Sequence, residues 1–152
     1  DYSEIKKMAQ EYFDDKFSYG IDFLKGANFY YQNDNFQISA FMLHQAAENF
    51  IKTIPLAYIL YGYKEHDLDF LIKKCKPFTL ELAKVFPRDT PEEERLFKLL
   101  QRAYIEARYN KKNFIVTKAD IDALISKIEL LRDITEKVCR DRIAFYDSAS
   151  RK

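Results

Sequence analysis

The stretch TPEEERLFKLLQRAYIEARY, residues 90–109, predicts a helix and with it the class of fold. Thr90 is a good N-cap, Pro91 fits the first helical position, and the three glutamates that follow suit the positive end of a helix dipole. One face of the segment is apolar and is expected to point inward; it carries Leu96, Leu99, Leu100, Ala103 and Ala107. This spacing is typical of an amphipathic helix packed against other helices.

Helical periodicity recurs along the rest of the chain. The segments are about 3–32, 36–61, 67–76 and 117–146, and a short helix is expected at 78–86. The connections are short, which favours antiparallel neighbours. The sequence therefore predicts an all-α fold, an up-and-down four-helix bundle with an extra short helix. We expect one domain over residues 1–147 and a frayed tail at 148–152.

The composition narrows the class of protein. The chain has 152 residues, of which 47% are hydrophobic and 32% charged, which argues against a disordered tail. A net charge of +1 is too small for a protein that holds RNA by charge alone. No apolar run reaches the roughly 18 residues of a membrane span, so no membrane partner is expected. Cys75 and Cys139 lack a CxxC partner and are expected to be free thiols in the cytoplasm. Because the chain opens at Asp1, we expect a fragment of a longer polypeptide.

Several kinds of site are not expected. His44 and His66 are 22 residues apart, and neither HExxH nor CxxC occurs, so no metal site is predicted. The sequence has neither GxGxxG nor GxxxxGK[ST], and its three glycines could build neither phosphate-binding loop. We therefore expect no metal and no cofactor.

A small positive site flanked by aromatic residues is predicted near the end of the 90–109 helix. Arg108 follows Tyr104 by four residues, which places a guanidinium beside a ring on one helix face. Tyr109, Lys111 and Lys112 are the next members of this site. The arginine fork could hold a phosphate while Tyr109 stacks on a base.

The same residues allow a plainer interpretation. Arg102 and Glu106 are four residues apart and could form a surface pair, and Arg108 would simply suit the negative end of the helix dipole.

A second unusual patch is the polar group in HQAAE, residues 44–48, inside an otherwise apolar helix. His44 and Glu48 are one turn apart and can bond. His44 is either a buried histidine that fixes the register of the bundle or a residue that contacts a ligand. The first helix is crowded with aromatic residues, which indicates either a thick aromatic core or a surface covered by a second copy or a neighbouring domain.

Three patches together resemble the HEPN domain family (higher eukaryotes and prokaryotes nucleotide-binding). FMLHQAAENFIK at 41–52 is similar to the family's F-x-x-[HQ]-Q-A-A-E-x-x-[IL]-K run. HDL at 66–68 is like its H-D-L helix start, and YIEARY at 104–109 is like its Y-x-x-[AS]-R-Y segment. The resemblance covers about residues 13–134 and implies a bundle of four or five helices.

The resemblance also implies two kinds of function. The family includes metal-independent RNases of toxin–antitoxin and defence systems, and binding modules beside nucleotidyltransferase domains. The RNase members are similar to one another in an arginine followed, after four to six residues, by a histidine, with the pair in a cleft between protomers. Arg108 matches the arginine, but Asn113, Phe114 and Ile115 stand where the histidine would be. An asparagine cannot act as a general base near neutral pH, so RNase activity is doubtful. Of the arginine–histidine pair, only the arginine that binds phosphate is retained.

Three hypotheses follow. The first is a non-catalytic module that binds a nucleotide or RNA phosphate through Arg108, with Tyr104, Tyr109, Lys111 and Lys112 around it. This module would work as a homodimer or beside a nucleotidyltransferase domain. The second is a metal-independent RNase with a displaced base, for which His44 is the evident substitute and Asn113 a further candidate. The third is a structural interaction domain that uses exposed rings of the first helix, such as Tyr30 or Tyr31.

Overall fold

The computed structural model describes residues 1–152 and contains five α-helices, two 3-10 turns and no strand. The elements in chain order are α1 (Tyr2–Gln32), α2 (Phe36–Ile59), α3 (Leu68–Cys75), η1 (Glu81–Lys84), α4 (Pro91–Tyr109), η2 (Lys111–Asn113) and α5 (Lys118–Ser150). The predicted all-α helical bundle is confirmed.

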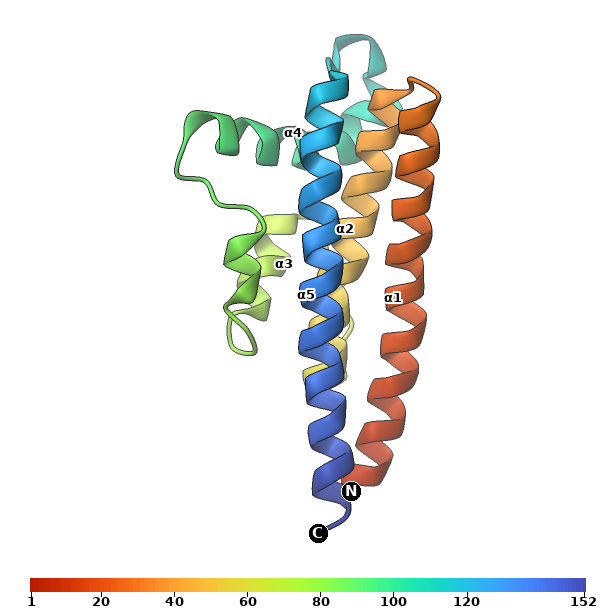
Figure 1. The fold of residues 1–152 in the computed structure, drawn as a ribbon, viewed down its shortest axis with the longest axis vertical. Helices are drawn as coiled ribbons and strands as arrows, with labels where there is room; N and C mark the ends of the chain where they lie inside the picture. Colours follow the sequence, from red (N-terminus) through yellow and green to blue (C-terminus); the bar gives the residue numbers. More distant parts are fainter.

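The three longest helices lie together along the long axis of the molecule (Figure 1). α1 runs antiparallel to both α2 and α5, and the two chain ends meet at one end of the bundle. α2 and α5 run in the same direction because the chain passes through α3 and α4 between them. α4 crosses the long axis in this view and packs on α2, as does α3. α2 is therefore the central helix and contacts all four others.

Two helix starts follow the capping boxes of the sequence. The Thr90 and Thr117 hydroxyls accept from the backbone N–H groups of Glu93 and Asp120, and both acidic side chains accept in return from the N–H of the capping threonine. Each box satisfies donors that a helix start would otherwise leave unpaired. α5 then continues past the expected end at Tyr146 as far as Ser150, while fraying of 148–152 stays a prediction.

The short helix expected at 78–86 is largely wrong, because only the 3-10 turn η1 forms there. The N–H groups of Phe78 and Thr79 bond back to the carbonyl of Cys75 and close the end of α3. The Thr79 hydroxyl then accepts from the N–H of Glu81, which starts a new turn rather than a continuous helix. Leu82 and Val85 are buried within this irregular segment.

α1 and α2 approach closely at Gly20. A Cβ atom built there would lie 2.4 Å from Cε1 of Phe50, so only glycine fits beside that ring. Phe50 is fully buried, and Phe17 packs on it with ring centroids 5.1 Å apart. The glycine therefore allows α1 to lie close against α2 at this position.

α2 is buried along most of its length, yet six of its buried residues are polar: Ser39, His44, Glu48, Asn49, Lys52 and Thr53. Two of these, Glu48 and Lys52, are ordinarily charged groups that rarely lie inside a protein unless they are paired. Most of their hydrogen-bond partners lie in α2 itself. The exceptions are Ser39, whose hydroxyl donates to the carbonyl of Ala27 on α1, and Glu48, which also bonds to His66 in the loop before α3. No helix of the structure combines the length and the apolar character needed to cross a membrane.

Candidate functional site

Arg108 lies in the last turn of α4, and its guanidinium is held in a fixed position. Nε donates to the backbone carbonyl of Tyr104 at 2.8 Å, and a second guanidinium nitrogen donates to the same oxygen. The guanidinium carbon lies 4.5 Å from the centre of the Tyr104 ring, 4.8 Å from that of Phe41 and 5.0 Å from that of Tyr109. Stacking on aromatic faces and a carbonyl bond orient the fork while its remaining donors stay free.

No carboxylate pairs with this arginine. Arg108, Lys111, Lys112 and Lys118 follow one another from the end of α4 to the start of α5, and none makes a salt bridge. Apart from Arg108, only Lys118 has an aromatic partner, since its Nζ lies 5.6 Å from the centre of the Tyr31 ring. The overall charge of the chain is near zero, so a run of unpaired cations is a local feature that attracts anions.

A buried ion pair lies beside this positive region. Glu48 and Lys52 are 5% and 6% exposed, and Lys52 Nζ lies 3.0 Å from Glu48 Oε2. The other carboxylate oxygen, Oε1, lies 2.8 Å from Nδ1 of His66. Both oxygens of the buried carboxylate therefore have a hydrogen-bond partner, and its charge is compensated by Lys52.

The predicted contact between His44 and Glu48 is wrong. Nδ1 of His44 instead lies 3.2 Å from Oε1 of Gln45, while Glu48 turns to His66 in the loop that leads to α3. His44 is only 1% exposed, and burial lowers the pKa of its imidazole. The alternative of a buried histidine inside the bundle agrees with this placement.

Tyr104 connects the two regions. The His66 ring stacks on it with centroids 4.5 Å apart at 20°, the His44 ring lies 5.0 Å away at 35°, and Arg108 lies over the same phenol. Phe41 completes the aromatic group, with its centroid 6.4 Å from that of Tyr104. A surface hollow of about 340 Å³ opens here; it is lined by His44, His66, Asp67, Gln101, Arg102 and Tyr104.

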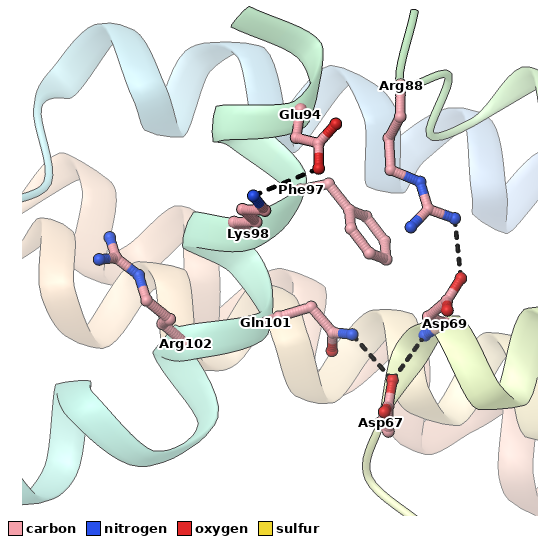
Figure 2. A pocket seen from close by; sticks show the side chains of 8 residues that line it. All are labelled: Asp67, Asp69, Arg88, Glu94, Phe97, Lys98, Gln101 and Arg102. Atoms are coloured by element: carbon pink, nitrogen blue, oxygen red, sulfur yellow. Dashed lines mark hydrogen bonds and ion pairs between the residues drawn. The ribbon is translucent and has the colours of Figure 1, made fainter. Parts of the chain in front are cut away.

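A second hollow of about 450 Å³ lies next to it between α3 and α4 (Figure 2). It shares Asp67, Gln101 and Arg102 with the first hollow. The Gln101 amide donates to Asp67 at 2.8 Å, and Asp67 also caps α3 by accepting from the N–H of Asp69 (Figure 2).

The charges of this second hollow neutralise one another. Arg88 donates to Asp69 at 2.8 Å, and Lys98 lies 3.3 Å from Glu94 (Figure 2). Bonds from Arg88 and then Lys73 hold the pKa of Asp69 below its usual value. A groove whose charges are already paired is a weaker anion site than the region around Arg108.

The comparison with known families agrees with the motifs. The model of the HEPN domain family matches residues 14–138, which is most of the chain. The chain belongs to the HEPN domain family. HEPN domains are helical modules associated with nucleotides and RNA. A comparison with curated proteins found no match.

In this HEPN domain the predicted site residues fall into two groups. Tyr104, Tyr109 and Arg108 come together, as their spacing predicts, and the expected pair of Arg102 with Glu106 forms at 3.7 Å. Lys111 and Lys112 follow in the exposed turn η2.

The other two predicted residues differ in placement. Asn113 donates its amide to Asn110 at 2.9 Å, while His44 is buried with its ring 5.0 Å from that of Tyr104, at the base of the hollow. His66, Glu48 and Lys52 were not predicted as site residues, although all three lie in the motifs that carry the resemblance. No group of three or more His, Cys, Asp or Glu side chains gathers in a way that could hold a metal ion.

Proposed function

We propose that this HEPN domain binds a nucleotide or an RNA phosphate at Arg108 and does not cleave it. The observation that carries the proposal is the guanidinium of Arg108, which is held over three aromatic rings and has no carboxylate partner. An oriented fork with free donors is suited to phosphate oxygens. Lys111 and Lys112 add positive charge beside it.

Base stacking is the second part of the proposal. Tyr109 is 75% exposed, and its ring lies 5.0 Å from the Arg108 guanidinium. A base that stacks on this ring would place its phosphate near the arginine. Stacking on an exposed aromatic ring tolerates any base, so we expect weak sequence preference.

The test is a binding titration with a short single-stranded RNA, octauridine with a rhodamine label, followed by fluorescence anisotropy. Arg108→Gln should weaken binding roughly 10- to 100-fold, because charge-assisted hydrogen bonds contribute about 1.5–3 kcal/mol each. Arg108→Lys keeps the charge but loses the fork, so its affinity for the RNA should lie between those of the wild type and Arg108→Gln.

Arg140→Gln is the matched control. Arg140 is also exposed and lies 4.9 Å from a ring, that of Phe13, but it pairs with Glu136 on α5. Its loss should leave RNA affinity unchanged. Equal affinity in wild type and Arg108→Gln, or no binding by the wild type, would refute the proposed function. A second titration with ATP as competitor separates nucleotide from RNA as the preferred ligand.

The absence of cleavage is proposed because no histidine follows Arg108 and because His44 is buried; it requires that the exposed His66 does not act as a base. RNA incubated with the wild type in EDTA at neutral pH should remain intact. Cleavage that disappears in Arg108→Ala would instead support a metal-independent RNase with a displaced base, as found in toxin–antitoxin systems. His44→Ala is expected to lower stability rather than to change activity selectively.

The working assembly is proposed as a homodimer or a complex with a nucleotidyltransferase domain in the cytoplasm. The support is the family resemblance together with exposed rings on α1, among them Tyr12, Tyr19 and Phe29. Tyr31 is a poor member of such a surface, because its hydroxyl donates to Asp122 and its ring packs against Phe36. Sedimentation of Phe29→Ser beside the wild type tests the surface, and a monomeric wild type would remove the homodimer from the proposal.

A further inference from the structure

We propose that His66 is a second phosphate-contacting residue of the Arg108 site, held in place by the buried Glu48–Lys52 pair. The proposal rests on the proposed function, because it assigns a further residue to the same ligand. Its consequence is that binding of a phosphodiester is coupled to the uptake of a proton by the protein.

The ring orientation of His66 follows from its partner. Nδ1 lies 2.8 Å from Glu48 Oε1, and an ionised carboxylate can only accept hydrogen bonds, so Nδ1 carries a proton. The lone pair of the neutral ring is therefore on Nε2, on the other side of the imidazole. The His66 side chain is 48% exposed and lines the hollow of about 340 Å³, so its ring is accessible to a ligand.

Stacking on Tyr104 fixes the plane of the His66 ring. The imidazole lies nearly parallel to the Tyr104 ring, with an interplanar angle of 20° and centroids 4.5 Å apart. The Arg108 guanidinium lies 4.5 Å from the centre of the same ring. His66 and Arg108 therefore both pack on the Tyr104 ring, so a strand that passes this ring can contact the two residues with different phosphates.

The charges around His66 determine what its protonation does. On α2, Lys52 already compensates Glu48, and His44 is buried. On α4, Arg102 faces the hollow and pairs with Glu106 at 3.7 Å, outside the hollow.

Asp67 is the one carboxylate that lines this hollow. Its Oδ1 is occupied by the Gln101 amide and by the backbone N–H groups of Asp69 and Phe70. A proton on Nε2 of His66 would thus add a positive charge that Glu48 does not fully cancel, together with a new donor toward the solvent.

Proton linkage gives the sign of the effect. Imidazole is the side chain that changes charge between pH 5 and 8, and a phosphodiester keeps its single negative charge over that range. A diester that binds the protonated ring more tightly than the neutral ring must bind more tightly as the pH falls. His44 is the only other histidine and is buried, so His66 is the accessible imidazole of the chain.

The experiment measures the affinity of the rhodamine-labelled octauridine for the full chain at several pH values from 8.0 to 5.5 at constant ionic strength. Wild-type affinity should increase roughly tenfold or more as the pH falls, because a hydrogen bond to a charged group is gained. His66→Gln removes the imidazole and keeps a polar side chain, so the affinity of this variant should be nearly independent of pH. Circular dichroism at both extremes checks that each protein remains folded.

Lys64→Gln is the matched control. Lys64 is an exposed cation in the same loop and makes no salt bridge, so its replacement should leave the pH dependence intact. A His66→Gln protein that keeps the wild-type pH dependence would overturn the inference and leave the proposed function standing. Loss of the dependence in both variants would also overturn it. A wild type that binds at no pH would refute the proposed function itself.

Discussion

The imidazole of His66 stacks on the phenol ring of Tyr104, with centroids 4.5 Å apart at an interplanar angle of 20°. This contact brings the loop before α3 against the C-terminal part of α4. Glu48 of α2 reaches the same histidine from the other side. Three elements that are distant in the sequence thus meet at one exposed ring, next to the unpaired guanidinium of Arg108.

The first prediction concerns the aromatic support. Tyr104→Leu should weaken octauridine binding roughly threefold or more, since the stacking of a cation on a ring contributes about 0.5–1 kcal/mol at an exposed site. Tyr104→Phe keeps the ring and should bind like the wild type, because the Tyr104 hydroxyl makes no hydrogen bond within the chain. The measurement is anisotropy at pH 7. Wild-type affinity in the leucine variant would contradict the role of the ring.

The second prediction concerns the buried ion pair. Glu48→Gln leaves Lys52 as an uncompensated buried charge and should lower the free energy of unfolding by about 3–5 kcal/mol. Lys52→Met should lower the free energy of unfolding by less, because His66 remains as a partner of the Glu48 carboxylate. The double variant should be more stable than Glu48→Gln alone. Urea denaturation of the three variants and the wild type measures these differences, and additive losses would contradict the pairing.

The helices and their starts could be predicted because their signals are local. The Thr117 box and the adjacency of Tyr104 to Arg108 depend only on residues three or four positions apart, and both are present. The end of α2 could not be predicted in the same way. The helix ends at Ile59, and Leu60 after it adopts a left-handed conformation with φ of 56°, where glycine or asparagine would be the usual signal.

The hydrogen bonds of the buried Glu48 could be predicted only in part. The sequence marks Glu48 as unusual in an apolar helix. The spacing of one turn predicted His44 as its partner. Its partners in the structure are Lys52, one turn further along α2, and His66, which is 18 residues further along the chain. The path of the loop that returns this histidine to α2 depends on how α3 and α4 pack, which helical periodicity does not encode.

The third prediction concerns the close contact of α1 with α2. Gly20→Ala should destabilise the protein by about 1–3 kcal/mol, because the new methyl group would overlap the buried ring of Phe50. Gly62→Ala is the control, since a Cβ at that position lies 3.7 Å from its nearest neighbour and would cause no overlap. Thermal unfolding of both variants is sufficient. Equal melting temperatures would mean that the two helices can separate without cost.

The fourth prediction concerns the two thiols. Burial raises the pKa of Cys75 to about 12, and burial also raises that of Cys139, so neither is a thiolate near neutral pH. The Cys75 thiol also lies 3.6 Å from the carbonyl of Ile51, which Pro55 leaves without its helical donor. Ellman's reagent at pH 8 should label neither cysteine in the native protein and both in guanidinium chloride. Rapid labelling of the native protein would contradict their burial.

The fifth prediction concerns acid stability at the start of α5. Burial alone would raise the pKa of Asp120, but bonds from Arg95 and Thr117 outweigh it, and the pKa is lowered. A carboxyl whose folded pKa lies below its unfolded value of about 3.9 adds stability above that value and loses it as the pH falls through the folded pKa.

Asp120→Asn should therefore lower the free energy of unfolding at pH 7 by about 1–3 kcal/mol and make it less dependent on pH below 5. Asp15→Asn is the control, because the exposed Asp15 side chain makes no salt bridge. Urea denaturation from pH 7 to pH 3 measures both effects. If Asp120→Asn lost stability as steeply in acid as the wild type, the acid sensitivity would have to lie in another carboxylate, with Asp69 the next candidate because Arg88 and Lys73 lower its pKa.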